Sequence, residues 1–134
     1  MIFVPSYFDF VRLRNWLKER DYHFAALSEY SSGSDIARNR TFFMDGRLDI
    51  LLVTERFYFF RRYKIRGIKH ALFYGLPEHA HFYSEIVNRI EASNDETATI
   101  LYSKYDRLKM ERVLGIGRTN KMIEGKKETF MYTA

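Results

Sequence analysis

The sequence of 134 residues contains no cysteine. Disulfides, thiolate zinc sites and cysteine nucleophiles are therefore excluded, and the composition fits a reducing compartment. Long hydrophobic runs are also missing: none approaches the ~18 residues that a membrane span requires, and the first residues lack the pattern of a signal peptide. The chain has no internal repeat and no low-complexity segment. We therefore expect a partner other than a membrane.

Apolar and aromatic residues are plentiful, at 46% and 17% of the chain. A chain of this length and composition is expected to form one domain, residues 1–134, and to bury roughly two thirds of the surface that its unfolded state exposes. A strand pattern begins at once, at Ile2-Phe3-Val4. We therefore expect the domain to be a fragment of a longer protein.

Strand-like apolar runs alternate along the chain with segments of helical periodicity. Strands are predicted at residues 2–4, 23–27, 49–54, 68–74 and 97–102. Helices are predicted after Pro5-Ser6, at 35–44 and 55–63, and at 104–114, where Gly115 would cap the end. A further helix is predicted to start at Gly75-Leu76-Pro77, with Pro77 near its first turn. This alternation predicts an α/β fold with a mainly parallel sheet.

Two local features of this pattern are also interpreted. Ser6 and Asp9 have the spacing of a capping box at the start of the first helix. Residues 117–134 match no regular element clearly, so they are expected to form a C-terminal extension. A hairpin that turns at Gly125 is the form that we predict for it.

A basic and aromatic segment, Arg56 to Lys69, lies between two of the predicted strands. Its sequence, RFYFFRRYKIRGIK, has six Lys or Arg, five aromatic residues and no acid, so it contributes +6 to a chain whose net charge is +5. Such cations beside stackable rings suit phosphate backbones and unpaired bases. Alternatively, the rings of an amphipathic helix face the core and the charges are merely solvated; composition alone favours neither. The candidate residues for binding RNA or an acidic partner are Arg56, Phe57, Tyr58, Arg61, Arg62, Lys64, Arg66 and Lys69.

Several short motifs resemble the second RecA-like lobe of superfamily 2 helicases. Phe43-Met44-Asp45-Gly46 resembles the F-x-x-G that precedes a strand in those lobes, and Leu52-Val53-Thr54-Glu55 resembles their L-x-T-D. Leu76-Pro77, followed by Tyr83, is similar to the approach to their arginine-rich motif. The resemblance implies a RecA-like three-layer domain with helicase second-lobe topology. It also implies an N-terminal helicase-like lobe in the same protein.

A more specific resemblance covers nearly the whole chain. VPSYFDFVRLRNWLK, TERFYFFRRYKIRGIKHALFYGLPEHAHFYSEIVN and the ending around Tyr105-Asp106-Arg107 resemble the C-terminal domain of the digestive organ expansion factor family. This family consists of nucleolar proteins associated with the U-three small nucleolar RNA. The resemblance implies the nucleus and nucleolus as location and a place in the small-subunit processome, a ribonucleoprotein. Pre-ribosomal RNA, small nucleolar RNA and other processome proteins are the implied partners, and processing of 18S ribosomal RNA in ribosome biogenesis is the implied role.

The chain departs from the helicase motif H-R-x-G-R-x-x-R, whose arginines meet the γ-phosphate in active enzymes. Counted without gaps from Pro77, the histidine position falls on Glu85. The three arginine positions fall on Ile86, Arg89 and Ala92. Arg89 is thus the one residual candidate for a phosphate contact.

The preceding helicase motif is also altered. Its ribose-contacting acid would fall near Lys64, a reversal of charge, while its arginine would persist as Arg61. The phosphate-binding G-x-x-x-x-G-K-[ST] and the D-E-A-D-like acids are absent from this chain.

We therefore predict a pseudo-helicase scaffold that is not an enzyme, needs no cofactor and binds RNA, processome proteins or both. The alternatives are the second lobe of an active ATP-dependent RNA helicase and a protein-docking domain without RNA contact. His79 and His81 are two residues apart, so on a helix they point to different faces and no metal site is expected.

Overall fold

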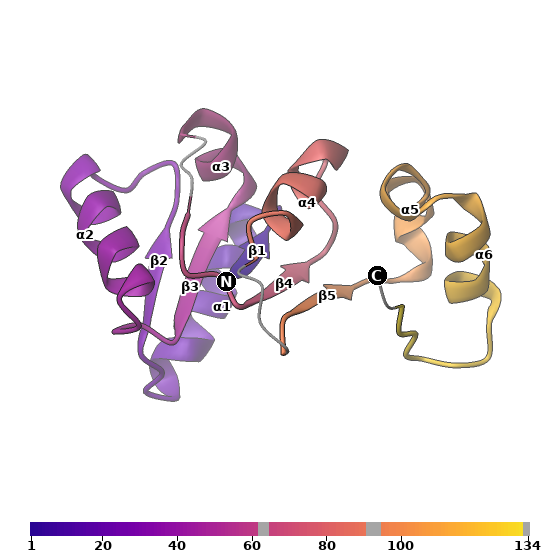
Figure 1. Ribbon diagram of the computed structural model, residues 1–134, viewed down its shortest axis with the longest axis horizontal. Helices are drawn as coiled ribbons and strands as arrows, with labels where there is room; N and C mark the ends of the chain where they lie inside the picture. Colours follow the sequence, from indigo (N-terminus) through magenta and orange to yellow (C-terminus); the bar gives the residue numbers. More distant parts are fainter. Residues whose placement is uncertain (62–64, 91–94, 133–134) are drawn as a thin grey trace.

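Five parallel strands form one sheet in the order β2-β3-β1-β4-β5 (Figure 1). The structure, a computed structural model, describes residues 1–61, 65–90 and 95–132. The strands are β1 (Ile2–Val4), β2 (Phe24–Leu27), β3 (Ile50–Thr54), β4 (His70–Tyr74) and β5 (Thr97–Leu101). The predicted α/β fold with a mainly parallel sheet is confirmed.

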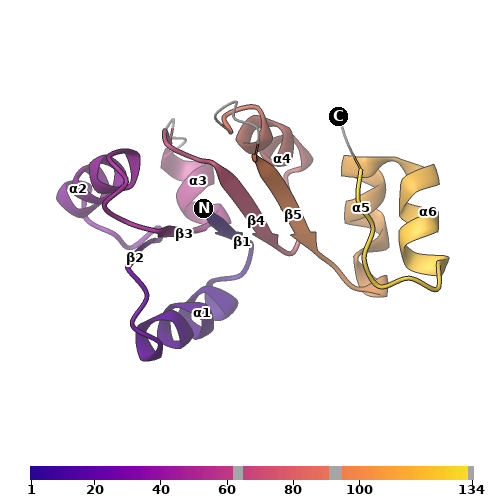
Figure 2. The ribbon, with the colours of Figure 1, turned by 60° about the horizontal axis from the view of Figure 1, so that its bottom comes forward.

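Helices cover the two faces of the sheet unequally. They are α1 (Tyr7–Glu19), α2 (Gly33–Met44), α3 (Glu55–Arg61), α4 (Ala80–Val87), α5 (Arg107–Leu114) and α6 (Ile116–Glu124), with a 3-10 turn η1 (Lys104–Asp106) before α5. Figure 2 shows α1 on one face, α2, α3 and α4 on the other, and α5 with α6 beside β5. Right-handed crossovers explain why α1 lies on a different face from α2, α3 and α4. The connection from β1 to β2 moves toward one edge of the sheet, whereas every later connection between strands moves toward the other edge.

The main core lies between the sheet and helices α2, α3 and α4. β3 sits near the centre of the sheet, and its Leu51, Leu52 and Val53 are fully buried. Leu51 and Val53 face this main core, whereas Leu52 packs with Phe10 and Leu17 of α1. The continuous apolar run of β3 therefore reflects burial on both faces. No described helix is long and apolar enough to cross a lipid bilayer.

The C-terminal extension begins as a helix that runs to Glu124, which contradicts the hairpin that we predicted. Gly115, at φ 86°, ends α5, and α6 begins at the next residue. Thr119 and Met122 of α6 are buried, and Met122 packs with Met110 of α5 and with Leu76. Gly117 is tolerated in the first turn of α6 because this packing stabilises the helix.

The capping box that we predicted at the start of α1 does not form. Ser6 is the N-cap residue and has extended backbone angles, but within the described part of the chain its side chain makes no capping hydrogen bond. The backbone carbonyl of Ser6 accepts the N–H of Phe10 at 3.0 Å, so α1 starts with its ordinary first bond. Phe10 and Leu17 anchor the helix to the sheet instead.

Replacing Gly67 by alanine is expected to destabilise the fold by about 2 kcal/mol or more. Gly67 has φ 86°, and an added Cβ would lie 3.0 Å from the Cα of Met44, so left-handed strain and a backbone clash act together. Urea unfolding of the full-length protein measures the effect. The matched control is Gly117→Ala in α6, where the Cβ meets nothing within 4 Å and stability should hold or rise. Equal stability of the two variants would contradict the prediction.

Candidate functional site

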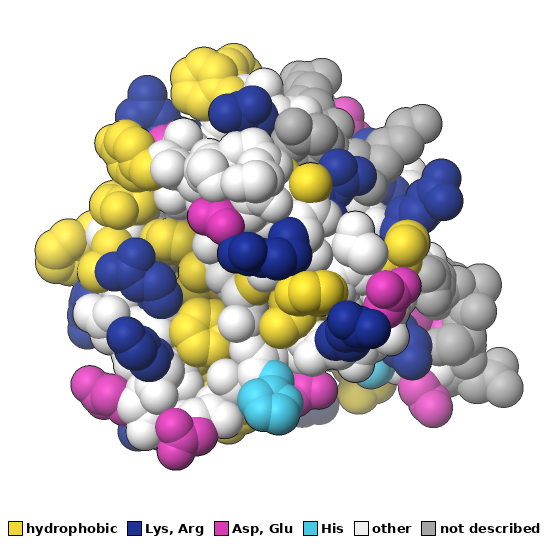
Figure 3. All heavy atoms as spheres, turned by 90° about the vertical axis from the view of Figure 1, so that its left-hand side faces the viewer, with side chains coloured by type: hydrophobic (Ala, Val, Ile, Leu, Met, Phe, Trp, Pro, Cys, Tyr) yellow, Lys and Arg dark blue, Asp and Glu magenta, His cyan; other side chains and the backbone are white. Residues whose placement is uncertain are grey.

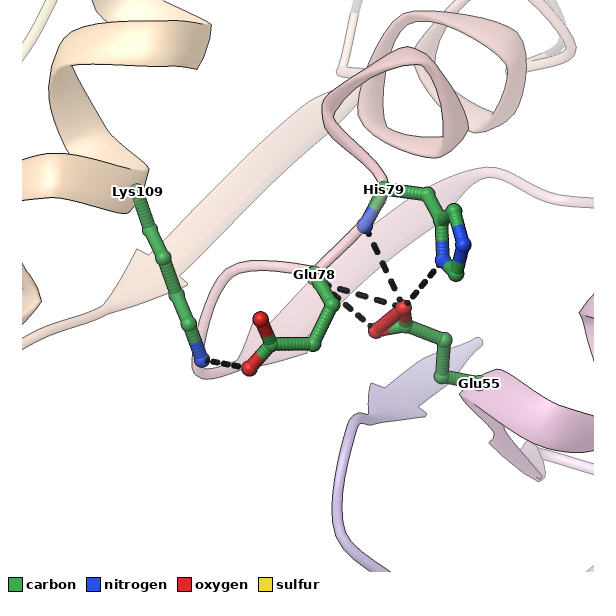
Figure 4. A network of polar contacts seen from close by, with 4 residues as sticks. All are labelled: Glu55, Glu78, His79 and Lys109. Atoms are coloured by element: carbon green, nitrogen blue, oxygen red, sulfur yellow. Dashed lines mark hydrogen bonds and ion pairs between the residues drawn. The ribbon is translucent and has the colours of Figure 1, made fainter.

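The carboxyl edge of the sheet is where open α/β folds bind ligands, beside strands that lead to helices on opposite faces. Here β1 leads to α1, whereas β3 and β4 lead to α3 and α4 on the other face. The residues that follow β3 and β4 meet at this edge. Glu55, the first residue of α3, lies against the connection that leads from β4 to α4 (Figure 4).

The Glu55 carboxylate is held by four hydrogen bonds. Its two oxygens accept the backbone N–H of Glu78 at 2.8 and 3.0 Å. One of them also accepts the backbone N–H of His79 at 3.3 Å and lies 3.0 Å from the ring Nδ1 of His79. Glu55 is only 5% exposed. A buried carboxylate needs such donors, so the acid of the L-x-T-E sequence serves to hold a neighbouring loop.

The adjacent threonine starts helix α3. The Thr54 hydroxyl accepts the backbone N–H of Phe57 at 3.1 Å, which caps the first turn. The same hydroxyl donates to the carboxylate of Glu29, beyond the end of β2, also at 3.1 Å. Thr54 and Glu55 together therefore connect β3 with the loops that follow β2 and β4.

Helix α4 begins later than we predicted. Pro77 was expected near its first turn, but α4 begins at Ala80 and His79 is its N-cap. The backbone of His79 is extended, at φ −93° and ψ 101°, so the helix cannot include it, and the Glu55 carboxylate accepts the backbone N–H groups of Glu78 and His79 in the loop before α4. Glu78 in turn forms an ion pair of 2.5 Å with Lys109 of α5 (Figure 4).

The aromatic residues of α3 divide into an inner and an outer pair. Phe57 and Tyr58 are 0% and 1% exposed, so they belong to the core and cannot reach a partner in this fold. Their assignment as binding residues is therefore corrected. The outer pair is Phe59 and Phe60, which are 43% and 63% exposed and whose rings pack edge to face.

The cations of the same segment point outward. Arg56, Arg61, Arg66 and Lys69 are all exposed, and the guanidinium of Arg56 lies 5.9 Å from the centre of the Phe60 ring. Arg62 and Lys64, the other two candidates, lie outside the described residues. Ile65 and Ile68 are buried, so the chain after α3 is fastened to the core between its exposed cations.

Arg89 contacts the inside of the protein. Its guanidinium donates to the Tyr58 hydroxyl at 3.0 Å, and that hydroxyl donates to the Glu85 carboxylate at 2.8 Å. Glu85 stands at the histidine position of the helicase motif. Ile86, at the first arginine position, is buried in the core, and Ala92, at the third, lies outside the described residues. Glu85 and Arg89, the two polar residues at the described positions of this motif, are thus joined to the core through the Tyr58 hydroxyl.

Tyr83, His79 and His81, which the sequence analysis also considered, pack against neighbouring aromatic rings. Tyr83 packs on Phe73 with ring centres 4.9 Å apart, and burial raises the pKa of its hydroxyl, although the nearby Arg118 lowers it in part. His79 and His81 have ring centres 5.9 Å apart. Among the described residues no group of three or more His, Asp or Glu side chains is arranged to hold a metal ion.

Solved structures with this fold define the class of the domain. The chain is similar to the Escherichia coli DEAD-box protein SrmB, with a TM-score of 0.70, 22% identity and coverage of 84% of this chain and 65% of that one. It is also similar to the C-terminal domain of the DEAD-box protein Dbp5, with a TM-score of 0.66, 17% identity and coverage of 94% and 69%. The fold is that of the C-terminal, RecA-like lobe of helicases, as the sequence predicted.

Within that class the chain belongs to the family described as "Utp25, C-terminal domain", whose model matches residues 1–132. It is 44% identical over 137 residues to the human U3 small nucleolar RNA-associated protein 25 homolog, covering 98% of this chain and 18% of the relative. It is 46% identical over 133 residues to the Arabidopsis thaliana protein NUCLEOLAR FACTOR 1, with the same coverage. The chain thus spans about a fifth of the length of these relatives, and the family resemblance found in the sequence is confirmed.

Replacing Glu55 by alanine should lower the free energy of unfolding by about 2 kcal/mol, because two backbone N–H groups lose their buried charged acceptor. Thermal or urea unfolding of the full-length protein measures this. Glu78→Ala is the control, since it removes only the exposed ion pair with Lys109 and should cost under about 1 kcal/mol. Glu55→Gln keeps an acceptor oxygen and should fall between the two. If Glu55→Ala proves as stable as Glu78→Ala, the carboxylate does not hold the loop.

Proposed function

We propose that this domain is a non-hydrolytic, helicase-like scaffold that binds RNA in the small-subunit processome during 18S ribosomal RNA processing. Relatives from mammals and fungi are named for association with the U3 small nucleolar RNA. A nucleolar, nuclear location follows from the same names. Because the chain covers about a fifth of those relatives, the proposal concerns the part that the domain plays in a longer protein.

The observation that supports a non-hydrolytic role is the network around Tyr58. An ATPase lobe needs cationic groups that can turn toward a γ-phosphate. Here Arg89 donates to the Tyr58 hydroxyl, and that hydroxyl donates to the carboxylate of Glu85, which stands at the histidine position of the motif. A carboxylate at that point would repel a phosphate rather than stabilise it.

The observation that supports RNA binding is the outward orientation of the basic segment. Arg56, Arg61, Arg66 and Lys69 are exposed, while the aromatic residues between them fill the core or pack beside them. Exposed cations along one segment attract a phosphate backbone and release its counterions. The exposed rings of Phe59 and Phe60 are available to stack on unpaired bases.

Removing two of these cations should weaken RNA binding and reduce its salt dependence. For Arg61→Ala with Lys69→Ala in the full-length protein, the log–log slope of affinity against salt should become shallower by about 1 to 1.5, at roughly 0.7 per lost phosphate contact. Titration of a labelled single-stranded RNA at several salt concentrations measures the slope. The control pair is Arg12→Ala with Lys18→Ala, which are exposed cations of α1 on the other face. If both double variants show a similar salt slope, the basic segment is not the RNA-binding surface.

The full-length protein should show no RNA-stimulated ATPase activity, and Arg89→Ala should change nothing in a phosphate-release assay. The reason is that Arg89 serves the internal network with Tyr58. ATP hydrolysis that RNA stimulates, and that Arg89→Ala abolishes, would instead support the active helicase.

A protein-docking role is the second candidate, and the exposed aromatic pair favours it. Phe60 is 63% exposed and packs against Phe59, whose ring centre lies 5.0 Å from that of His79. Such rings can anchor a partner without any phosphate. Association with the particle that is insensitive to salt and is lost on Phe60→Ala would favour this role over RNA binding.

A further inference from the structure

Helix α3 presents two stripes of side chains beside the loop that leads into α4. Residues four apart on a helix lie on the same face, so Glu55 and Phe59 form one stripe. This stripe meets the loop, where the ring centre of Phe59 lies 5.0 Å from that of His79. Arg56 and Phe60 form the neighbouring stripe, which is exposed. The helix therefore brings a carboxylate, two aromatic rings and a cation to one histidine.

Phe59, Phe60 and His79 form an open surface, which we call the aromatic platform. All three side chains are exposed. Phe59 contacts both of the others: its ring centre is 5.2 Å from that of Phe60, and its ring plane is tilted by 32° to that of His79. Figure 3 shows hydrophobic side chains next to Lys and Arg side chains at the top of the view, which is the level of α3 in Figure 1. Rings that are open to solvent and lie beside cations suit an unpaired nucleotide.

The ring of His79 is held from inside the protein. Oε2 of Glu55 accepts the backbone N–H groups of Glu78 and His79, so this oxygen acts as an acceptor. The same oxygen lies 3.0 Å from Nδ1 of His79, and Nδ1 must therefore supply the hydrogen between them. The Glu55 side chain is only 6% exposed, so its position is set by the fold. A histidine whose first nitrogen is bound in this way keeps a fixed ring orientation.

The second ring nitrogen of His79, Nε2, is left for a ligand. It points away from Glu55 in Figure 4, and no hydrogen bond joins it to any of the described residues. Nε2 accepts a hydrogen bond when the imidazole is neutral and donates one when the imidazole is charged. A hydroxyl group satisfies both forms, because it is a donor and an acceptor at once. A phosphate oxygen satisfies the charged form alone.

We infer that the aromatic platform binds one nucleotide of single-stranded RNA, with its base stacked on Phe60 and its ribose 2′-hydroxyl bonded to Nε2 of His79; this rests on the proposed RNA-binding function. Bases of any identity stack on exposed rings. The 2′-hydroxyl is the group by which a protein tells RNA from DNA. Arg56, whose guanidinium lies 5.9 Å from the centre of the Phe60 ring, is placed to meet the adjacent phosphate. The platform thus adds a choice of RNA over DNA to the general attraction of the cations.

The test compares binding of labelled oligouridylate and oligodeoxyuridylate of equal length to the full-length protein. The wild type should prefer the RNA strand. His79→Asn should lose about fivefold in RNA affinity, the worth of one hydrogen bond, with DNA affinity unchanged. Asparagine keeps a donor for Glu55 but has no group at the Nε2 position, so urea unfolding should match the wild type.

Two further variants serve as controls for the histidine. His79→Gln carries a polar group near the Nε2 position and should restore part of the preference for RNA. His81→Ala removes an exposed histidine two residues away and should bind both strands like the wild type. If His81→Ala abolishes the preference and His79→Asn does not, the assignment of His79 is wrong.

Phe60→Ala tests the stacking half of the site. It should weaken binding of both strands roughly tenfold and leave their ratio unchanged, because stacking does not involve the sugar. A Phe60→Ala variant that binds oligouridylate like the wild type overturns the stacked base. If that variant also loses association with the particle, the rings serve a protein contact instead.

The remaining outcomes separate this site from the proposed function. If Arg61→Ala with Lys69→Ala weakens oligouridylate binding but His79→Asn keeps the full preference for RNA, the site is refuted while the RNA-binding function stands. Equal losses for RNA and DNA in His79→Asn would refute the 2′-hydroxyl contact. A wild type that binds the two strands equally well refutes it too. A wild type that binds no oligouridylate overturns both the site and the proposed function.

Discussion

The contact between the Glu55 carboxylate and the backbone of Glu78 and His79 is the constraint on which the carboxyl edge depends. A carboxylate that is 5% exposed must be met by donors, and the loop before α4 supplies them. These two residues directly precede α4, which begins at Ala80. Every later position of α4, including Glu85, is then placed relative to α3. The buried Glu55 carboxylate thus links the first residue of α3 to the loop that leads into α4.

Tyr58 completes that placement by joining two polar residues of the region after β4 to the core. Its ring packs edge to face on Phe3 and Phe82, and its hydroxyl lies between Glu85 and Arg89. A nucleotide at this edge would have to compete with a hydrogen-bonded network that is anchored in the core. The groups that resemble helicase motifs have therefore taken structural roles: Thr54 caps α3, Glu55 holds a loop and Arg89 bonds to a tyrosine.

The sequence predicted what depends on periodicity and on long motifs. Alternating apolar runs located all five strands to within two residues, and the helicase-like motifs gave the correct class of fold. Contacts between distant residues could not be found in this way. Phe57 to Phe60 are four aromatic residues in succession, so their spacing cannot show which two face the core. The contact of Glu55 with the loop before α4 and the packing of Met122 in α6 join residues that are remote in sequence.

The two interpretations of the basic segment turn out to be compatible, because they apply to different side chains. Phe57, Tyr58, Ile65 and Ile68 are core residues, as the amphipathic interpretation requires. The described cations of the segment, Arg56, Arg61, Arg66 and Lys69, lie at exposed positions between or beside these core residues. The aromatic residues therefore hold the segment against the sheet and keep the cations in fixed positions. A fastened backbone spares a ligand the cost of ordering the main chain, although exposed Arg and Lys side chains still lose rotamer freedom on binding; this is the advantage that the segment would have over an equally basic disordered tail.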